Sequence, residues 1–377
     1  MRLFPKIQLI AILSASIGIF TSCTGKKSTD TEPTASDIPC SKVEIDLSPE
    51  YYDYVTGNKT TDIVVLKEDE NTMFVEPDRI LDANGKYYLL DSYSGSTVVA
   101  FTHDGKPYAH YGRVGQGPGE YNIPRDIDVT EDNIYILGDK KIIKYSDDGE
   151  YIDEITLPFF AEAFKMLSDG RILLNLGSNG EISPSLVITD SSAKEFTTLI
   201  SYPDGYVGGW STNDVFRKAG DEISFYLSPD DNMWLLDSNG NFTQAITFDF
   251  KQRSFPSEIK LDFLKRDRTS HEFLWFDNSP IRMNNGTWIG LVEDGGTQYT
   301  VIFSDADRRC GARPFDNNSS VYDIIEPMCA DLDDNIISYL DGEIAARCRD
   351  YDSLDPQVRA ALEDGDRALV IHKFDNN

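Results

Sequence analysis

The string GRVGQGPGEY, residues 112–121, is where residue types and spacing come nearest to a chemical motif. Gly115, Gly117 and Gly119 alternate within it, as glycines do in loops that hold a phosphate group. Such a loop must open a helix, usually with Lys-Ser or Lys-Thr at its end, so that backbone N–H groups face the anion. The residues after Tyr121 instead predict a turn and a strand, so nucleotide binding is not expected.

A structural role explains this string better. Glycines allow positive φ and close passage of the chain, and Pro118 stiffens it, which suits a tight crossover from the outer strand of one sheet to the inner strand of the next. The alternative is that the crossover also lines a binding site. The side chains that would contact the ligand are then Arg113, Gln116, Glu120 and Tyr121.

A second candidate segment is SYPDGYVGGWSTNDVF, residues 201–216, which is rich in glycine and aromatic residues. Tyr206 and Trp210 would stack on sugar rings or on a peptide, because aromatic side chains supply a large, rigid contact area. The alternative is that these rings only cover the edge of a sheet.

The third candidate segment, residues 251–276, concentrates lysines and arginines in an otherwise acidic chain. Arg266 and Arg268 are its candidate binding residues, for an anion, an acidic glycan or a docking partner. The alternative is that its basic side chains pair locally with the acidic surface.

Metal and catalytic motifs are not found in the sequence. Asp331, Asp333 and Asn335 have the spacing that begins a calcium loop, but the glycine and the distal glutamate are missing, so a simple β-turn is expected. The four histidines show no ligand spacing, and neither HExxH nor a GxSxG nucleophile elbow occurs. We therefore expect no catalytic residue, no metal and no cofactor.

The charge of the chain excludes some partners. Its 377 residues include 64 acidic and 35 basic ones, which gives a formal charge of −29. Such a surface repels nucleic acid phosphates, so nucleic acid binding is not expected. Apolar residues make up 40%, which is enough for a core, and many aromatic, Gly and Pro residues favour an all-β fold.

The N-terminal residues predict export and a lipid anchor. A basic start is followed by an apolar run from Leu9 to Phe20, as in a secretory signal peptide. The residues FTSC then resemble the bacterial lipobox, in which the cysteine, here Cys23, is diacylated. We expect a lipoprotein signal peptide at 1–22 and a flexible polar tether at 23–42. The alternative is a secreted protein with an ordinary cleavage site.

Cysteine spacing leaves the disulfide question open. Cys310, Cys329 and Cys348 are spaced 19 residues apart, which is compatible with neighbouring strands. Export would allow a disulfide among them, and buried thiols are the alternative.

A repeat of about 50 residues runs through the chain. A polar turn followed by a strand of aromatic and aliphatic residues occurs six times, and the interval between copies averages 50 residues. Asp-Gly and Asn-Gly hairpins follow several copies, so each repeat offers about four short strands. The six copies begin at residues 82, 130, 167, 228, 283 and 332.

Such repeats predict a six-bladed β-propeller over residues 43–377, with four-stranded antiparallel blades. Radial packing of several sheets buries both faces of each, whereas a sandwich needs no fixed period and a β-helix has a shorter one. Strands at 61–68 and 367–374 are expected to pair in one blade, which closes the ring without a free edge. A short helix is expected at 355–366.

The segment GRVGQGPGEYNIPRDI, residues 112–127, resembles the signature of six-bladed β-propeller lipoproteins of Bacteroidetes, which are similar to NHL-type propellers. The closing DRALVIHKF resembles the last strand of that family, and the resemblance extends over residues 43–374. It implies a propeller in the cell envelope, anchored by lipid and expected at the outer membrane, facing either the periplasm or the outside. It implies little about activity.

These observations favour a membrane-tethered, monomeric propeller that acts as a binding module for a glycan, a peptide or an envelope protein. The alternative is an enzyme, lactonase-like or lyase-like, with a metal in the axial channel, since propellers host such enzymes. Convergent carboxylates or histidines that hold a metal there would favour the enzyme. An apolar or unpaired lining would favour the binding module.

Overall fold

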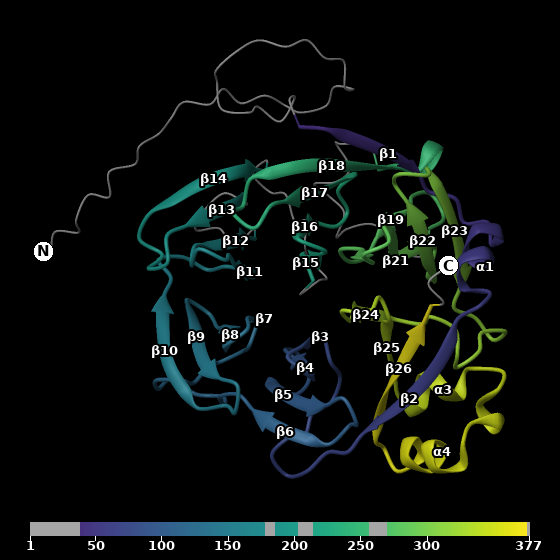
Figure 1. Cartoon of the computed structure of the whole chain (residues 1–377), viewed down its shortest axis with the longest axis horizontal. Coiled ribbons are helices and arrows are strands. Elements are labelled where there is room, and N and C mark those ends of the chain that lie inside the picture. Colours follow the sequence, from purple (N-terminus) through teal and green to yellow (C-terminus); the bar gives the residue numbers. More distant parts are fainter. Residues whose placement is uncertain (1–37, 178–184, 203–213, 256–269, 375–377) are drawn as a thin grey trace, which may run out of the picture. The chain divides into compact units, whose positions relative to one another are not determined.

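The computed structural model describes residues 38–177, 185–202, 214–255 and 270–374. Six β-sheets stand around a common axis in the unit Pro39–Asn377, and the strands of each sheet follow one another from the inside of the ring to its outside (Figure 1). The predicted all-β, six-bladed propeller is therefore confirmed. Within the described residues, no helix has both the length and the apolar character needed to cross a membrane.

Blades 1 to 3 each contain four consecutive antiparallel strands. Blade 1 consists of β3 (Arg79–Ala83), β4 (Lys86–Asp91), β5 (Thr97–Thr102) and β6 (Pro107–His110). Blade 2 consists of β7 (Asp126–Val129), β8 (Asn133–Leu137), β9 (Lys141–Ser146) and β10 (Tyr151–Thr156). Blade 3 consists of β11 (Ala163–Met166), β12 (Ile172–Leu176), β13 (Ser185–Thr189) and β14 (Phe196–Ser201).

Blades 4 to 6 depart from this simple order. Blade 4 consists of β15 (Phe216–Ala219), β16 (Glu222–Tyr226), β17 (Asn232–Leu236) and β18 (Phe242–Asp249). Blade 5 has two short inner pieces, β19 (Trp275–Phe276) and β20 (Ile281–Arg282), beside β21 (Thr287–Asp294), β22 (Thr297–Ser304) and β23 (Arg309–Pro314). Blade 6 consists of β24 (Pro327–Ala330), β25 (Ile336–Leu340), β26 (Arg367–Lys373) and, from the other end of the chain, β2 (Thr60–Leu66).

The ring closes as the sequence predicts. β2 pairs antiparallel with β26, from Thr60 opposite Lys373 to Leu66 opposite Arg367. Short helical segments lie between β25 and β26: α3 (Gly342–Ala346), the 3₁₀ turn η4 (Tyr351–Ser353) and α4 (Pro356–Glu363). α4 matches the predicted helix, and the side chain of Asp355 caps it by accepting from the Gln357 and Val358 N–H groups.

The N-terminal part adds a strand that the sequence analysis did not expect. β1 (Cys40–Glu44) pairs parallel with β18 and becomes the fifth strand of blade 4, so it takes up residues that we had expected in the tether. α1 (Glu50–Thr56) then contacts β23 on the outside of blade 5. A further 3₁₀ turn, η2 (Lys251–Arg253), follows β18.

The core lies between the blades, because each sheet is buried on both faces. In β4, Tyr87 and Leu89 belong to a cluster shared with blade 6, whereas Tyr88 and Leu90 belong to one shared with blade 2. Successive side chains of a strand point to opposite faces, so this alternation joins the sheet to both neighbours. Each pair of adjacent blades shares such a cluster. This explains why the strands have long apolar runs.

One of the six sequence markers is misplaced. Five of them fall on the turn between the first and second strands of a blade, but SPDDNMWLLD, residues 228–237, lies at the turn between β16 and β17. The corresponding turn in blade 4 is Gly220-Asp221, between β15 and β16. Both turns precede an apolar strand, so the pattern alone does not separate them. The number of blades is unaffected.

Candidate functional site

The two ends of the ring differ in their loops. In every blade the antiparallel order places the connection from the previous blade and the loop between the second and third strands at one end, here called the connector face. The hairpins between first and second strands and between third and fourth strands lie at the other end, the turn face. Propeller sites lie at these ends or along the axis.

The axis is crossed by a buried network of ion pairs that starts at Arg79, the first residue of β3. Its guanidinium pairs with the Asp126 carboxylate of blade 2, and both side chains are almost fully buried. Its Nε lies 3.0 Å from Oδ1 of Asp214, just before blade 4, and its Nη2 donates to the Phe216 carbonyl at 2.8 Å. Asp126 also accepts from the Phe164 N–H of blade 3 at 2.9 Å.

Arg217 extends this network to another blade. Its Nη2 lies 2.7 Å from Oδ2 of Asp214, and its Nη1 donates to the Met328 carbonyl of blade 6. Arg79 and Arg217 are thus joined by the two oxygens of one carboxylate, that of Asp214. Side-chain and backbone groups of blades 1, 2, 3, 4 and 6 take part.

The carboxylates beside Arg79 favour its charged form. Burial disfavours the charged form of Arg79, but the carboxylates of Asp126 and Asp214 outweigh burial and raise the pKa of Arg79. Beside this set, Lys165 Nζ lies 2.5 Å from Oδ1 of Asp128, whose Oδ2 accepts from the Met166 N–H at 2.8 Å. The inner strands of blades 2 and 3 are therefore also joined by a buried charge pair.

The network is neither of the two axial linings considered from the sequence, which were groups that hold a metal and groups that are apolar or unpaired. A divalent cation needs carboxylates whose oxygens are available. The oxygens of Asp126 instead accept from Arg79 and from the Phe164 N–H, and those of Asp214 form ion pairs with Arg79 at 3.0 Å and with Arg217 at 2.7 Å. The lining is also neither apolar nor unpaired. These residues therefore do not fit an axial metal, and among the described residues no group of three or more His, Cys, Asp or Glu side chains is placed to hold a metal ion.

The GRVGQGPGEY string is the predicted crossover between β6 and β7, on the connector face. Arg113 Nε donates to Oε1 of Glu120 at 2.7 Å, and Oε2 of Glu120 accepts from the Gly117 N–H at 2.8 Å. A side chain at Gly115 would lie 2.1 Å from Glu120 Oε2 and would displace this carboxylate from its partners. The loop is thus closed on itself.

The four candidate residues of this string lie in different surroundings. Arg113 and Glu120 pair with each other, and Tyr121 is 1% exposed, with its hydroxyl donating to the Tyr111 carbonyl at 2.9 Å. Gln116 is exposed. That these four residues contact a ligand stays a prediction. Tyr121 is the least accessible of them, because it is buried.

The other candidates lie outside the described residues: Cys23, Tyr206, Trp210, Arg266 and Arg268. Two basic residues at the start of the third candidate segment are described. Arg253 forms a two-pronged pair with the Asp294 carboxylate, one arm of which measures 3.0 Å, and Lys251 Nζ lies 2.5 Å from Oε1 of Glu44. These two residues follow the local pairing that we had considered as the alternative.

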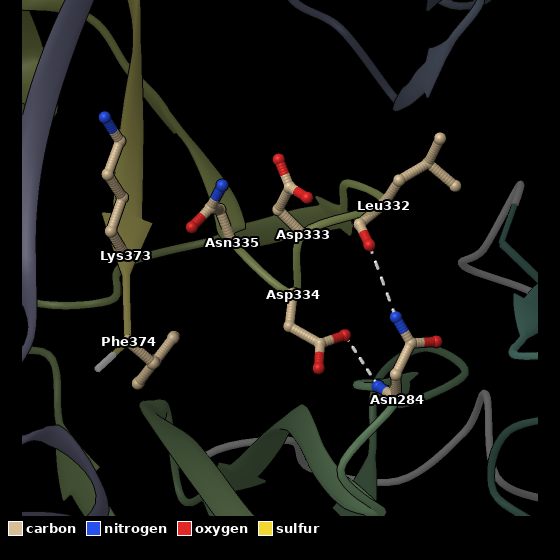
Figure 2. Close-up of a pocket in the computed structure, with 7 residues that line it drawn as sticks. All are labelled: Asn284, Leu332, Asp333, Asp334, Asn335, Lys373 and Phe374. Atoms are coloured by element: carbon tan, nitrogen blue, oxygen red, sulfur yellow. Dashed lines mark hydrogen bonds between the residues drawn. The ribbon is translucent and has the colours of Figure 1, made fainter. Parts of the chain in front are cut away.

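The turn face has a polar hollow of about 570 Å³ (Figure 2). Asp333 and Asn335 donate their N–H groups to Asp331 Oδ1 at 2.8 and 2.9 Å, so the calcium-like spacing forms a simple turn, as predicted. Across the hollow, the Asn284 N–H donates to Asp334 Oδ1 at 2.6 Å. Lining residues come from blades 5 and 6: Asn284, Leu332, Asp333, Asp334, Asn335, Lys373 and Phe374.

Cys310, Cys329 and Cys348 are thiols, and the last two are buried. Cys329 and Cys348 lie in the core cluster between blades 6 and 1. Of the two possibilities for these cysteines, the structure has buried thiols for this pair.

The connector face of blade 1 has an exposed apolar surface that the sequence does not predict. Met73, Val75 and Tyr93 are 64%, 52% and 75% exposed, although they are large and apolar or aromatic. We call these three residues the connector patch. Met73 and Val75 belong to the connection between β2 and β3, and Tyr93 to the loop between β4 and β5. In the sequence nothing distinguishes them from core residues.

Comparisons with known proteins agree with the fold. The model of the family described as "Domain of unknown function (DUF4934)" matches residues 58–340. A Bacteroides fragilis protein whose name describes it as exported is 18% identical, with a TM-score of 0.68 over 90% of this chain and 100% of that one. A member of the DUF4221 family from Bacteroides vulgatus is 11% identical, with a TM-score of 0.52 over 85% of this chain and 100% of that one. No curated protein sequence matches the chain.

Proposed function

The chain belongs to the DUF4934 family, and we propose that it is an exported, lipid-anchored β-propeller that acts as a binding module in the cell envelope. The observation that carries the binding role is the connector patch, where Met73, Val75 and Tyr93 are exposed at one end of the ring. On the axis, the side chains of Arg79, Asp126, Asp214 and Arg217 form the ion-pair network. Because these side chains bond to one another across the axis, a ligand is expected to bind at the ends of the ring.

The location rests on the first residues of the chain and on a similar fold. Cys23 follows an apolar run and lies in the lipobox-like FTSC, which supports lipid attachment and an outer-membrane location. The similar fold of a Bacteroides fragilis protein named as exported supports export. The likeness to NHL-type propellers and the lipid anchor are parts of this proposal.

The enzyme alternative has less support. A lactonase-like or lyase-like propeller needs carboxylates or histidines on the axis that can hold a metal. Here the carboxylates of Asp126 and Asp214 are bonded by arginines in a buried network, and freeing them would leave buried charges without partners.

Fractionation of cells tests the anchor. The full chain and its Cys23→Ala variant are produced in a bacterium that processes lipoproteins, and membranes are separated from soluble fractions. We expect the parent in the membrane fraction and the variant outside it. An equal distribution would contradict the anchor. Protease treatment of intact cells then reports whether the propeller faces outward.

Direct binding tests the module. The chain from residue 24 onward is labelled and applied to glycan and peptide arrays, with the heat-unfolded chain as control. We expect saturable binding to at least one class that unfolding abolishes. Turnover of lactone substrates without any saturable binder would support the enzyme instead.

A further inference from the structure

We propose that the connector patch docks a segment of a partner protein that carries lysine or arginine beside aliphatic residues. This inference rests on the proposed function, because it names the kind of partner that the binding module takes. Three features of the described residues support it: exposed apolar side chains, a rigid base beneath them, and acidic residues around them.

The apolar part of the surface is concentrated in two adjoining loops. Single exposed apolar residues are normal on proteins, but clusters of them mark interaction sites. Met73, Val75 and Tyr93 each leave more than half of their surface in water. The two loops meet directly, because the Val75 N–H donates to Oδ2 of Asp91, at the end of β4.

A single buried carboxylate holds both loops in place. Asp91 has no exposed surface, and its oxygens accept four backbone N–H groups. Oδ2 accepts from Val75 and Glu76 at 2.8 and 3.2 Å, and Oδ1 accepts from Ser94 and Gly95 at 3.0 and 2.6 Å. A side chain at Gly95 would meet Oδ2 of Asp91 at 2.5 Å, so the loop fits only a glycine there.

A second carboxylate ties the same loop to the first strand. Asp78 precedes β3, and its Oδ2 accepts from the Ser92 N–H at 2.6 Å, next to Tyr93. The exposed side chains are therefore displayed by backbone that is already fixed. A partner that binds them avoids the entropy cost of ordering these loops.

The charge around the patch determines the partner's chemistry. The connection Lys67–Asp78 carries one lysine and five acidic residues: Glu68, Asp69, Glu70, Glu76 and Asp78. Arg367 pairs with Glu68, and Lys67 with Asp366, but Glu70 and Glu76 are exposed and form no ion pair with a described residue. A basic partner complements this rim, whereas an acidic one is repelled.

Charge also argues against two other occupants. A second copy of this chain would bring the same acidic connection and a formal charge of −29. An anionic lipid surface would be repelled in the same way. A basic segment with aliphatic side chains satisfies both the apolar centre and the acidic rim.

Fluorescence anisotropy with labelled 12-residue peptides tests the proposal on the chain from residue 24 onward. The probe alternates lysine and leucine, and its matched peptides replace lysine by glutamate or leucine by serine. We expect the lysine–leucine peptide to bind best. Tyr93→Ser and Glu76→Lys should each weaken its affinity at least about tenfold, which corresponds to about 1.4 kcal/mol. Tyr54→Ser, in α1 on the outside of blade 5 and 72% exposed, should leave affinity unchanged.

Several results would overturn the proposal. One is an equal loss of affinity in Tyr54→Ser and Tyr93→Ser. Another is equal binding of the lysine–serine and lysine–leucine peptides. The third is the lack of saturable binding of the lysine–leucine peptide. Light scattering that shows a dimer lost in Tyr93→Ser would assign the patch to self-association and also overturn it. A glycan bound equally by the parent and by Tyr93→Ser would overturn the patch but leave the proposed binding function standing. Thermal unfolding of each variant verifies that it is folded.

Discussion

Arg79 Nε lies 3.0 Å from Oδ1 of Asp214, although the two residues belong to opposite sides of the six-bladed ring. Arg79 begins blade 1, and Asp214 immediately precedes blade 4. The pair therefore spans the axis. Both side chains are buried, at 2% and 6% exposure, so little water screens the interaction.

Removal of the Arg79 side chain is expected to destabilise the fold strongly. Arg79→Met keeps much of the side-chain volume but leaves the carboxylates of Asp126 and Asp214 without this partner. Breaking a buried pair on one side costs about 3–5 kcal/mol of unfolding free energy. Urea unfolding followed by tryptophan fluorescence measures it. Arg113→Met is the control, because Arg113 pairs with Glu120 at the surface, where a pair contributes about 0–1 kcal/mol. Equal effects in the two variants would contradict a structural role for the axial network.

His372 is expected to make the fold sensitive to acid. Its ring is fully buried, with Nε2 3.1 Å from Ser338 Oγ, and burial lowers its pKa from 6.5 to about 3. Below pH 6.5 the unfolded chain takes up a proton that the folded chain does not, so the folded state loses stability as the pH falls from 6.5 towards 3. His372→Gln keeps a polar side chain without this titration.

The measurement for His372 is the difference in unfolding free energy between the parent and His372→Gln, at pH 7 and at pH 5. We expect this difference to change by about 2 kcal/mol in favour of the variant at the lower pH. Other titrating groups contribute equally to both proteins, so their effects cancel in this difference. One such group is Asp78. Burial raises its pKa to about 6, so its effect on the unfolding free energy has the opposite sign to that of His372. Identical pH profiles would show that His372 is not buried in its neutral form.

Alanine substitutions at Gly112 and Gly85 distinguish the cost of a steric clash from the cost of a left-handed backbone conformation. Both have positive φ, +70° and +74°, but a side chain at Gly112 would meet the Tyr145 hydroxyl at 2.3 Å, whereas nothing lies within 4 Å at Gly85. Gly85→Ala should cost about 1–2 kcal/mol from the left-handed backbone alone. Gly112→Ala should cost at least about 2 kcal/mol more, as overpacking does. Thermal unfolding compares them, and equal losses would disprove the tight packing of the crossover.

The attachment of β1 depends mainly on Val43. This residue is fully buried and packs in the cluster between blades 4 and 5. Val43→Asp places a charge there and should detach β1, which exposes the edge of β18 and favours association of chains. Hydrogen exchange at residues 245–249 should rise, and light scattering should detect oligomers. Lys42→Gln, at an exposed position of the same strand, removes only a surface ion pair with Asp249 and serves as the control. Unchanged exchange in Val43→Asp would contradict the prediction.

The blades could be predicted because their signals are local. Asp-Gly turns and alternating apolar residues determine each hairpin over a few positions, and the closing strands at 61–68 and 367–374 have the same character. β1 could not be predicted, because in CSKVE the two less exposed positions are Ser41 and Val43, and a polar Ser41 leaves no alternation of apolar residues in the sequence. The strand is formed by its partner, β18.

The site could be predicted far less well, because its relationships are long-range. Arg79, Asp126 and Asp214 show no common spacing, and only the ring brings them together. The connector patch was missed for a different reason. Met73, Val75 and Tyr93 have the composition of core residues, and their exposure follows from Asp91, which holds their loops outside the sheet.

The pairing of β2 with β26 also constrains how the chain can be made. β2 is synthesised before β3 to β25, and its partner β26 is synthesised after them. Until residue 367 has been synthesised, no ordering of the other blades can complete blade 6, because long-range pairing must wait for both strands. A nonsense mutation just before residue 367 would therefore leave β2 and β25 each without a neighbour, although the strands of the other blades are present. Residues 367–373 thus decide whether the ring is completed.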